Sequence, residues 1–299
     1  MTIQRDHHEL ARTPPMGWNS WNSFRCYDLT EQVVAETADA MVSTGMRDAG
    51  YEYVVVDDCW QAFHRDFDGR LRSNPERFAS GMVALGREIH ARGLKFGLCL
   101  SPGRRTCAMI YARYPGEALG SYGHEQLDAD TFAEWGVDYL KYDWCRANSG
   151  GTHLHEADAF ASMAAALKRA GRPTVYSMLW AMLAAPLMAG NDVRAMSEAT
   201  RALLTDPEII SISQDPAGVQ GARVERMGKL EFWRRPLSDG HAIGVLNRGR
   251  SQVTLPARAQ DFLAASGSGA VDISSGATDR FDVVLAPHEM RLWRVRKAQ

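Results

Sequence analysis

Two charged side chains lie two residues apart in the apolar stretch "VDYLKYDWC", residues 137–145 of the 299-residue chain. Side chains repeat every second residue along a β-strand, so a strand here places Lys141 and Asp143 on the same face. A neighbouring ammonium group lowers the pKa of a carboxyl group and favours its ionised form. The spacing therefore predicts an ionised aspartate of the kind that attacks the anomeric carbon of a sugar as a covalent nucleophile.

Polar and aromatic side chains also stand at two other predicted strands. The run "YEYVVVDDCW" contains Asp57 and Asp58, whose carboxylates could accept hydrogen bonds from sugar hydroxyls. The run "MGWNSW" contains Trp18, whose ring offers a flat apolar surface to the C–H face of a sugar. Each set alone is explained by structure, as a turn-forming pair, an ion pair between Lys141 and Asp143, or a core tryptophan. Three sets at three strands together favour a sugar site.

These residues need a scaffold that brings strand ends together. Before residue 200, short β-like runs alternate with helical patterns, which is typical of a parallel sheet covered by helices. In such folds, side chains at the carboxyl ends of the strands face the ligand. Six strands are countable, fewer than the eight of a TIM barrel. They cover residues 16–21, 51–60, 94–101, 137–145 and 173–177, and a short run that follows a predicted buried helix and ends at Asn191 and Asp192.

The pattern changes from about Arg223, where short runs alternate apolar and polar residues between turn signals. Such runs are typical of an antiparallel sandwich. The stretch "QDPAGVQG", residues 214–221, is predicted to be a hinge. The sequence therefore predicts an α/β chain with two domains, a shortened TIM-type β/α barrel over residues 1–221 and a small antiparallel β domain over residues 222–299.

Composition and charge limit the partners. The formal net charge is −2 and the estimated pI is about 6.5, so no basic field attracts nucleic acid or anionic lipid. The longest apolar run, residues 178–190, contains a proline and is too short to cross a bilayer. The first residues are charged where a signal peptide needs an apolar run. We expect a cytoplasmic protein that binds a small neutral ligand.

Cysteine and histidine spacing does not predict a metal site. The histidines show no ligand spacing, and the cysteines form no C-x-x-C pair. Buried thiols in a reducing compartment are the simpler expectation. The five cysteines are Cys26, Cys59, Cys99, Cys107 and Cys145.

Several motifs resemble, in order and spacing, those of the α-galactosidases of glycoside hydrolase family twenty-seven. They are "TPPMGWNSWNSF", "YVVVDDCWQ", "GLKFGL", "RRTCA", "WGVDYLKYDWC", "LWAMLAAPLMAGNDVR" and "QDPAGVQG". The resemblance covers nearly the whole chain. It implies a TIM barrel followed by a small antiparallel β domain. It also implies retaining hydrolysis of terminal α-D-galactosides in small molecules or oligosaccharides, without a metal or an organic cofactor.

The resemblance also implies residue roles. Asp143 matches the family's nucleophile and Lys141 a lysine that contacts galactose, while Asp57 and Asp58 match the pair that holds the galactose hydroxyls. Trp18 matches the stacking tryptophan. Two cysteine pairs match positions that are disulfide-bonded in secreted relatives, namely Cys26 with Cys59 and Cys107 with Cys145.

This chain departs from the family pattern at three places. Cys99 stands where the family has a sugar-contacting tyrosine, and Trp144 where it usually has a small or amide residue. After Ser177, the family's segment with the general acid/base aspartate on strand six and all of strand seven is missing. A retaining glycosidase needs that second carboxyl group about 5 to 5.5 Å from the nucleophile. Asp192 is the best-placed carboxylate that remains, and its expected role is structural.

Four functions follow as alternatives. The first is an α-galactosidase, or a relative that acts on α-linked N-acetylgalactosamine or β-linked L-arabinopyranose. The second is a galactose-binding remnant without catalysis, which the missing segment favours. The third is an incomplete chain that does not fold alone. A metal-dependent hydrolase is the remaining alternative, with weak support because His7 and His8 lie in the N-terminal tail.

Overall fold

The chain divides into two units in the computed structural model, which describes residue 11 and residues 13–178, 186–265 and 269–297. The first unit holds the described residues up to 178 together with residues 186–205, and the second holds the described residues from 206 onwards. The predicted domains 1–221 and 222–299 stay a prediction.

The first unit is built on six parallel strands in the order β5-β4-β3-β2-β1-β6. β1 pairs in parallel with β2 on one side and with β6 on the other, so the last strand lies beside the first. Among the described residues, β5 and β6 each pair on one side only, and the sheet is a curled part of a barrel. This confirms the predicted shortened barrel. The strands are β1 (Met16–Asn19), β2 (Tyr53–Val56), β3 (Lys95–Leu100), β4 (Tyr139–Tyr142), β5 (Val175–Met178) and β6 (Leu187–Ala189).

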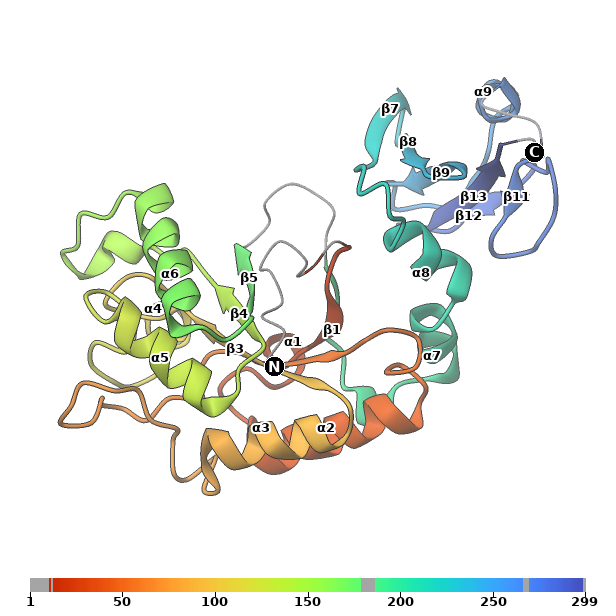
Figure 1. Cartoon of the computed structure of the whole chain (residues 1–299). Helices are drawn as coiled ribbons and strands as arrows, with labels where there is room; N and C mark the ends of the chain where they lie inside the picture. Colours follow the sequence, from red (N-terminus) through yellow and green to blue (C-terminus); the bar gives the residue numbers. More distant parts are fainter. Residues whose placement is uncertain (1–10, 12, 179–185, 266–268, 298–299) are drawn as a thin grey trace. The chain divides into compact units, whose positions relative to one another are not determined.

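Helices follow the strands, and α2, α3, α5 and α6 lie around the outside of the sheet (Figure 1). The Thr30 side chain caps α2 by accepting a hydrogen bond from Val33 N, as its sequence position predicts. Left-handed Gly136 and Gly171 end α5 and α6. The helices are α1 (Trp21–Phe24), α2 (Glu31–Ser43), α3 (Gly81–Ala91), α4 (Cys107–Tyr111), α5 (Glu125–Trp135), α6 (Glu156–Ala170) and α7 (Glu198–Leu204), with 3₁₀ turns η2 (Ala147–Gly150) and η3 (Val193–Ala195).

Several strands are shorter than predicted: β2 stops at Val56 and β4 at Tyr142, so Asp57, Asp58 and Asp143 follow their strands. The first strand stops at Asn19 because the Asn19 side chain accepts a hydrogen bond from Trp21 N, which turns the chain into α1. The last strand ends at Ala189, before the predicted Asn191 and Asp192. Most of the predicted buried helix before it lies outside the described residues. No helix of the described chain is long and apolar enough to cross a bilayer.

Apolar side chains from strands that are distant in sequence fill the inside of the curled sheet. Tyr53, Val55, Tyr139 and Val175 form one buried cluster, and Met188 packs against it. Burying one such side chain stabilises a fold by roughly 1.5 to 3 kcal/mol. The cluster therefore holds β2, β4, β5 and β6 together although the sheet has two free edges in the described part of the chain.

The second unit is antiparallel, as the alternating runs predict. Five strands pair in the order β11-β13-β9-β8-β7, and β10 pairs with β12. Its core contains Phe232 and Trp293, together with Ala259 and Leu263 from α9, a helix that the sequence analysis did not predict. The elements are α8 (Pro207–Ser213), β7 (Ala222–Met227), β8 (Leu230–Leu237), β9 (Gly240–Asn247), β10 (Val253–Thr254), α9 (Ala257–Ala265), β11 (Val271–Asp272), β12 (Val284–Leu285) and β13 (Met290–Arg296).

Candidate active site

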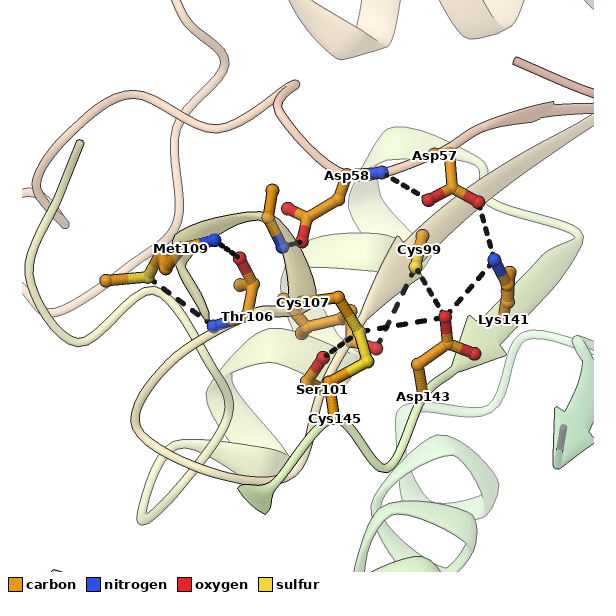
Figure 2. The surroundings of a disulfide bond; sticks show 12 residues. Asp57, Asp58, Cys99, Ser101, Thr106, Cys107, Met109, Lys141, Asp143 and Cys145 are labelled. Atoms are coloured by element: carbon orange, nitrogen blue, oxygen red, sulfur yellow. Dashed lines mark hydrogen bonds and ion pairs between the residues drawn. A yellow bond between two sulfur atoms is a disulfide. The ribbon is translucent and has the colours of Figure 1, made fainter. Parts of the chain in front are cut away.

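Lys141 joins two carboxylates at the carboxyl ends of β2 and β4. Its Nζ lies 2.7 Å from Asp57 Oδ2 and 3.1 Å from Asp143 Oδ2, and Figure 2 shows it between them. The predicted closeness of Lys141 and Asp143 is confirmed. Asp57 reaches Lys141 because the parallel register aligns Cys99 of β3 with Lys141, while Asp57 directly follows β2 on the other side of β3.

Asp57 is held in place by the end of β1. Its Oδ2 accepts a hydrogen bond of 2.7 Å from Asn19 Nδ2, and its backbone N–H donates to Ser20 Oγ at 2.9 Å. Its Oδ1 accepts a hydrogen bond from the backbone N–H of Asp58. Asn19 and Ser20 were not predicted as site residues, although both follow Trp18 in the chain. Asp57 is thus oriented towards Lys141 by contacts from two strands.

Asp58 points to the start of α4 instead of towards Lys141. Its Oδ2 accepts a hydrogen bond of 2.7 Å from the backbone N–H of Ala108, and its Oδ1 accepts one from Cys59 N. Burial raises the pKa of Asp58 above its usual value, although the hydrogen bonds from Ala108, Thr106 and Cys59 oppose this. Both carboxylate oxygens of Asp58 therefore already accept hydrogen bonds from the protein backbone, and only their remaining lone pairs are free for a sugar hydroxyl.

Asp143 is buried, with 7% of its surface exposed. Burial raises its pKa to about 6, because desolvation and the nearby Asp57 outweigh the lowering effect of Lys141. The spacing of Lys141 and Asp143 predicted a lowered pKa for Asp143, which is wrong in direction. Its Oδ1 has no hydrogen-bond partner among the described residues. At neutral pH the group is still mainly ionised, with one oxygen unpaired.

Two sulfur atoms lie against the same carboxylate. Cys99 Sγ is 3.9 Å and Cys107 Sγ 3.8 Å from Asp143 Oδ2. Burial raises the pKa of Cys99 well above its usual value, so this thiol is neutral. Cys107 is bonded to Cys145 (Figure 2).

Four of the five cysteines are paired, in the bonds Cys26–Cys59 and Cys107–Cys145, and Cys99 is free. The simpler expectation of buried thiols is thus wrong for these four, and the pairing implied by the family resemblance is found. Disulfides are rare in the cytosol, so the predicted cytoplasmic localisation stays a prediction. In the described chain, the only group with metal-binding geometry is Cys107, Asp143 and Cys145, and its two sulfurs are bonded to each other.

Trp18 forms part of the core of the first unit. It has no exposed surface, its Nε1 donates to Asn191 O at 3.0 Å, and its ring lies 5.9 Å from that of Phe24. The predicted stacking role therefore has no accessible ring face in this structure. Trp144 is partly exposed and packs on Phe160 at 6.0 Å.

Asp192 does not join the carboxylate cluster. It caps η3 and forms an ion pair of 2.9 Å with Arg194, whose hydrogen bonds lower the pKa of Asp192. A carboxyl group with a lowered pKa is a poor proton donor near neutral pH. Its expected structural role fits these contacts.

Comparison with known proteins identifies the chain. The α-galactosidase A family model matches residues 13–178 and 177–215, and the model of the α-galactosidase C-terminal β-sandwich domain matches residues 227–295. The chain belongs to the α-galactosidases of glycoside hydrolase family twenty-seven. An α-galactosidase of Cyamopsis tetragonoloba is 36% identical over 85% of this chain and 77% of its own length.

Solved structures share the fold of this α-galactosidase family member. α-Galactosidase I of Mortierella vinacea superposes with a TM-score of 0.80 at 24% identity. The match covers 95% of this chain and 97% of the Mortierella chain. An α-galactosidase of Saccharomyces cerevisiae with raffinose superposes with a TM-score of 0.72 at 24% identity. That match covers 83% of this chain and 77% of the Saccharomyces chain. The family and the fold of the chain are therefore established together.

Proposed function

We propose that this chain binds the terminal α-D-galactosyl group of a small galactoside or oligosaccharide, and that Asp143 is the nucleophile. The observation that carries the proposal is the Asp143 carboxylate, which is buried, sits beside the Lys141 ammonium and keeps one oxygen without a partner. Lys141, Asp57 and Asp58 would bind the galactose hydroxyls. Trp18 would stack on the sugar ring only after a movement that exposes its ring, which has no exposed surface in this structure.

In the proposed first step, Asp143 Oδ1 forms a bond to the anomeric carbon while the bond from that carbon to the aglycone oxygen breaks. The electron pair leaves with the aglycone, which takes a proton from solvent. Water then attacks the anomeric carbon, gives a proton to solvent and releases Asp143. Two displacements retain the configuration at the anomeric carbon.

We also infer that the family's acid/base segment is absent after Ser177. Two observations support this inference. The family model matches in two pieces that meet at residues 177 and 178. The alignment with the Cyamopsis relative extends over 328 positions, more than the whole 299-residue chain, although only 85% of the chain takes part. Several dozen positions of the relative therefore lack a counterpart, and loss of acid/base catalysis typically costs on the order of 10² to 10⁴ in rate.

An activated aryl α-galactoside tests the nucleophile, because its leaving group needs little protonation. We expect release of the aryl alcohol and a galactosyl group attached to the peptide that contains Asp143, detected by mass spectrometry. Asp143→Asn is the control and should show neither. Wild-type protein that releases no aryl alcohol, even at long times, contradicts the proposal.

Azide tests the missing acid/base group, because it attacks the anomeric carbon without losing a proton. If water attack is slow, added azide should speed the decay of the galactosyl-enzyme and yield an α-galactosyl azide. An unchanged decay rate, with rapid hydrolysis in water alone, would show that another group in the protein activates water.

A galactose-binding protein without catalysis is the second candidate, and the match in two pieces favours it. Calorimetry with millimolar galactose should then show binding that Lys141→Met abolishes, while no adduct forms from the activated galactoside. Absence of heat and of a thermal shift would remove this candidate. A cooperative thermal transition would argue against the third alternative, an incomplete chain that does not fold.

A further inference from the structure

The five-residue helix α4 begins with a residue that is bonded to the segment carrying Asp143. Cys107 is its first residue, and its disulfide partner Cys145 follows Asp143 by two positions. We propose that the Cys107–Cys145 disulfide positions the carboxylate site. Through α4, this bond fixes where the side chains of Asp143 and Asp58 lie relative to each other. The inference rests on the proposed function for the identity of the ligand.

The same helix holds the second carboxylate. Ala108 follows Cys107, and its backbone N–H donates to Asp58 Oδ2 at 2.7 Å. Cys107 Sγ itself lies 3.8 Å from Asp143 Oδ2, so the bond contacts the carboxylate that it positions (Figure 2). A shift of α4 would therefore move the surroundings of both acids at once.

In the described part of the chain, the segment just after Asp143 is held by the disulfide at Cys145 and by two side-chain contacts, Trp144 on Phe160 and Arg146 over the ring of Tyr111 in α4. β4 ends at Tyr142, and the last main-chain bond of this region to β3 is from Asp143 N to Leu100 O at 2.9 Å. Across the described residues, no main-chain hydrogen bond joins residues 144–146 to β3 or α4. The next close approach between main-chain segments is at Gly103, where a Cβ atom would lie 2.4 Å from Ala147 O. The disulfide lies between these two anchors.

The other disulfide offers a matched control. Cys26–Cys59 closes a separation of 33 residues and Cys107–Cys145 one of 38. The entropy that a disulfide removes from the unfolded chain depends on the logarithm of loop length, so the two bonds constrain that state almost equally. The Cys59 contact with Asp58 uses the backbone N–H, which a substitution of the side chain keeps. A difference between the two bonds at the site therefore reports positioning and not general stability.

The experiment compares the double variants Cys107→Ala/Cys145→Ala and Cys26→Ala/Cys59→Ala. The readouts are Tm and the titration of the Asp143 carboxyl carbon by NMR, assigned by its loss in Asp143→Asn. We expect a similar decrease of Tm in both variants. Only Cys107→Ala/Cys145→Ala should lower the pKa of Asp143 from about 6 towards its ordinary value of 3.8, because the carboxylate gains solvent.

Equal titration of Asp143 in wild type and both variants, or an equal shift in both variants, would overturn the inference. The titration needs neither galactose nor turnover, so failure of wild type to bind galactose or form an adduct would count against the proposed function alone. If Cys107→Ala/Cys145→Ala does not fold, Cys26→Ala/Cys59→Ala is titrated with and without dithiothreitol, because Cys107–Cys145 is then the bond that reduction breaks. Reduced protein with a cooperative transition and an unshifted Asp143 titration would likewise reject the positioning role.

Discussion

Each unit of the molecule buries a carboxylate next to cations, and the two carboxylates differ in how well their charge is balanced. Glu231 in the second unit is 3% exposed and lies 3.0 Å from Arg223 and 3.2 Å from Arg248. Asp143 in the first unit is similarly buried, but it shares the single cation Lys141 with Asp57. Glu231 therefore pairs with two cations, whereas Asp143 and Asp57 share one.

The pKa values follow this balance. Burial raises the pKa of Glu231, but hydrogen bonds from Arg248 and Arg223 lower it more, so the net shift is downward. Burial raises the pKa of Asp143 to about 6, and Lys141 offsets only part of this rise. A structural ion network needs enough cations to neutralise its buried carboxylates. A buried carboxylate whose charge is only partly neutralised, and whose pKa is therefore raised, is typical of functional sites. The comparison thus separates two buried carboxylates that burial alone would class together.

The largest expected effect comes from neutralising each carboxylate in turn. Asp143→Asn should reduce galactosyl-enzyme formation from an activated aryl α-galactoside by on the order of 10⁴-fold, because the amide is no nucleophile. Glu231→Gln is the matched change in the second unit and should leave this rate unchanged. Stopped assays with mass spectrometry measure both. Equal losses in the two variants would show that the rate reports stability.

The pH dependence of stability should have opposite signs at the two carboxylates. Asp143 has a folded pKa of about 6 and an ordinary value of 3.8, so the folded state holds more protons between them and stability falls as pH rises through this window. Neutralising Asp143 should thus stabilise the protein at pH 7, by up to about 3 kcal/mol. For Glu231, whose pKa is lowered, stability is lost as pH falls below its ordinary value of 4.5.

Denaturant unfolding of wild type, Asp143→Asn and Glu231→Gln between pH 4 and pH 7 measures these slopes. The difference between wild type and Asp143→Asn should grow towards pH 7, and that between wild type and Glu231→Gln should shrink at the acid end. Slopes of the same sign at both sites would break the comparison.

Removing Lys141 should sharpen the imbalance in the first unit. In Lys141→Met, Asp57 and Asp143 lose their shared cation, so the pKa of Asp143 should rise further above its ordinary value. Each unit of rise lowers the ionised fraction below that pKa roughly tenfold. The pH profile of adduct formation should therefore move to higher pH. An unmoved profile would mean that a different group controls the titration.

The smallest effect is expected from removing one of the two cations of Glu231. Arg248 is 63% exposed in its side chain, so solvent screens its ion pair. Arg248→Met should lower Tm only slightly, because Arg223 remains, and should leave adduct formation unchanged. Thermal unfolding measures the change. A loss as large as that of Glu231→Gln would show that the pair does not share the charge.

Local sequence patterns predicted the scaffold of the site well. The alternating pattern of residues 137–145 predicted that Lys141 and Asp143 lie close together, although Asp143 directly follows β4, and the apolar run of β2 placed Asp57 at its end. These features depend on neighbours in sequence. The second unit is similar, since its alternating runs predicted β8, β9 and β13, whereas α9 was missed because its two buried residues, Ala259 and Leu263, form too short a pattern.

The environment of the site could not be predicted in the same way. The pKa of Asp143 depends on desolvation by α4 and β3, which come from other parts of the chain. Asp58 is tied to the backbone of Ala108, fifty positions away, which no local pattern encodes. Trp18 looked like a sugar platform by type and place, but Asn191 and Phe24 cover it in the fold. The closeness of Lys141 and Asp143 followed from sequence, whereas the electrostatics of the site required the structure.

The neutral thiol of Cys99 can be used to measure access of small molecules to the site. The other four cysteines are bonded in pairs, so a small thiol-specific alkylating reagent has one free thiol to react with, 3.9 Å from Asp143 Oδ2. The rate of that alkylation measures how often the interior of the site opens to small molecules. Any sugar that fills the site should slow the labelling, which makes Cys99 a binding assay that needs no turnover.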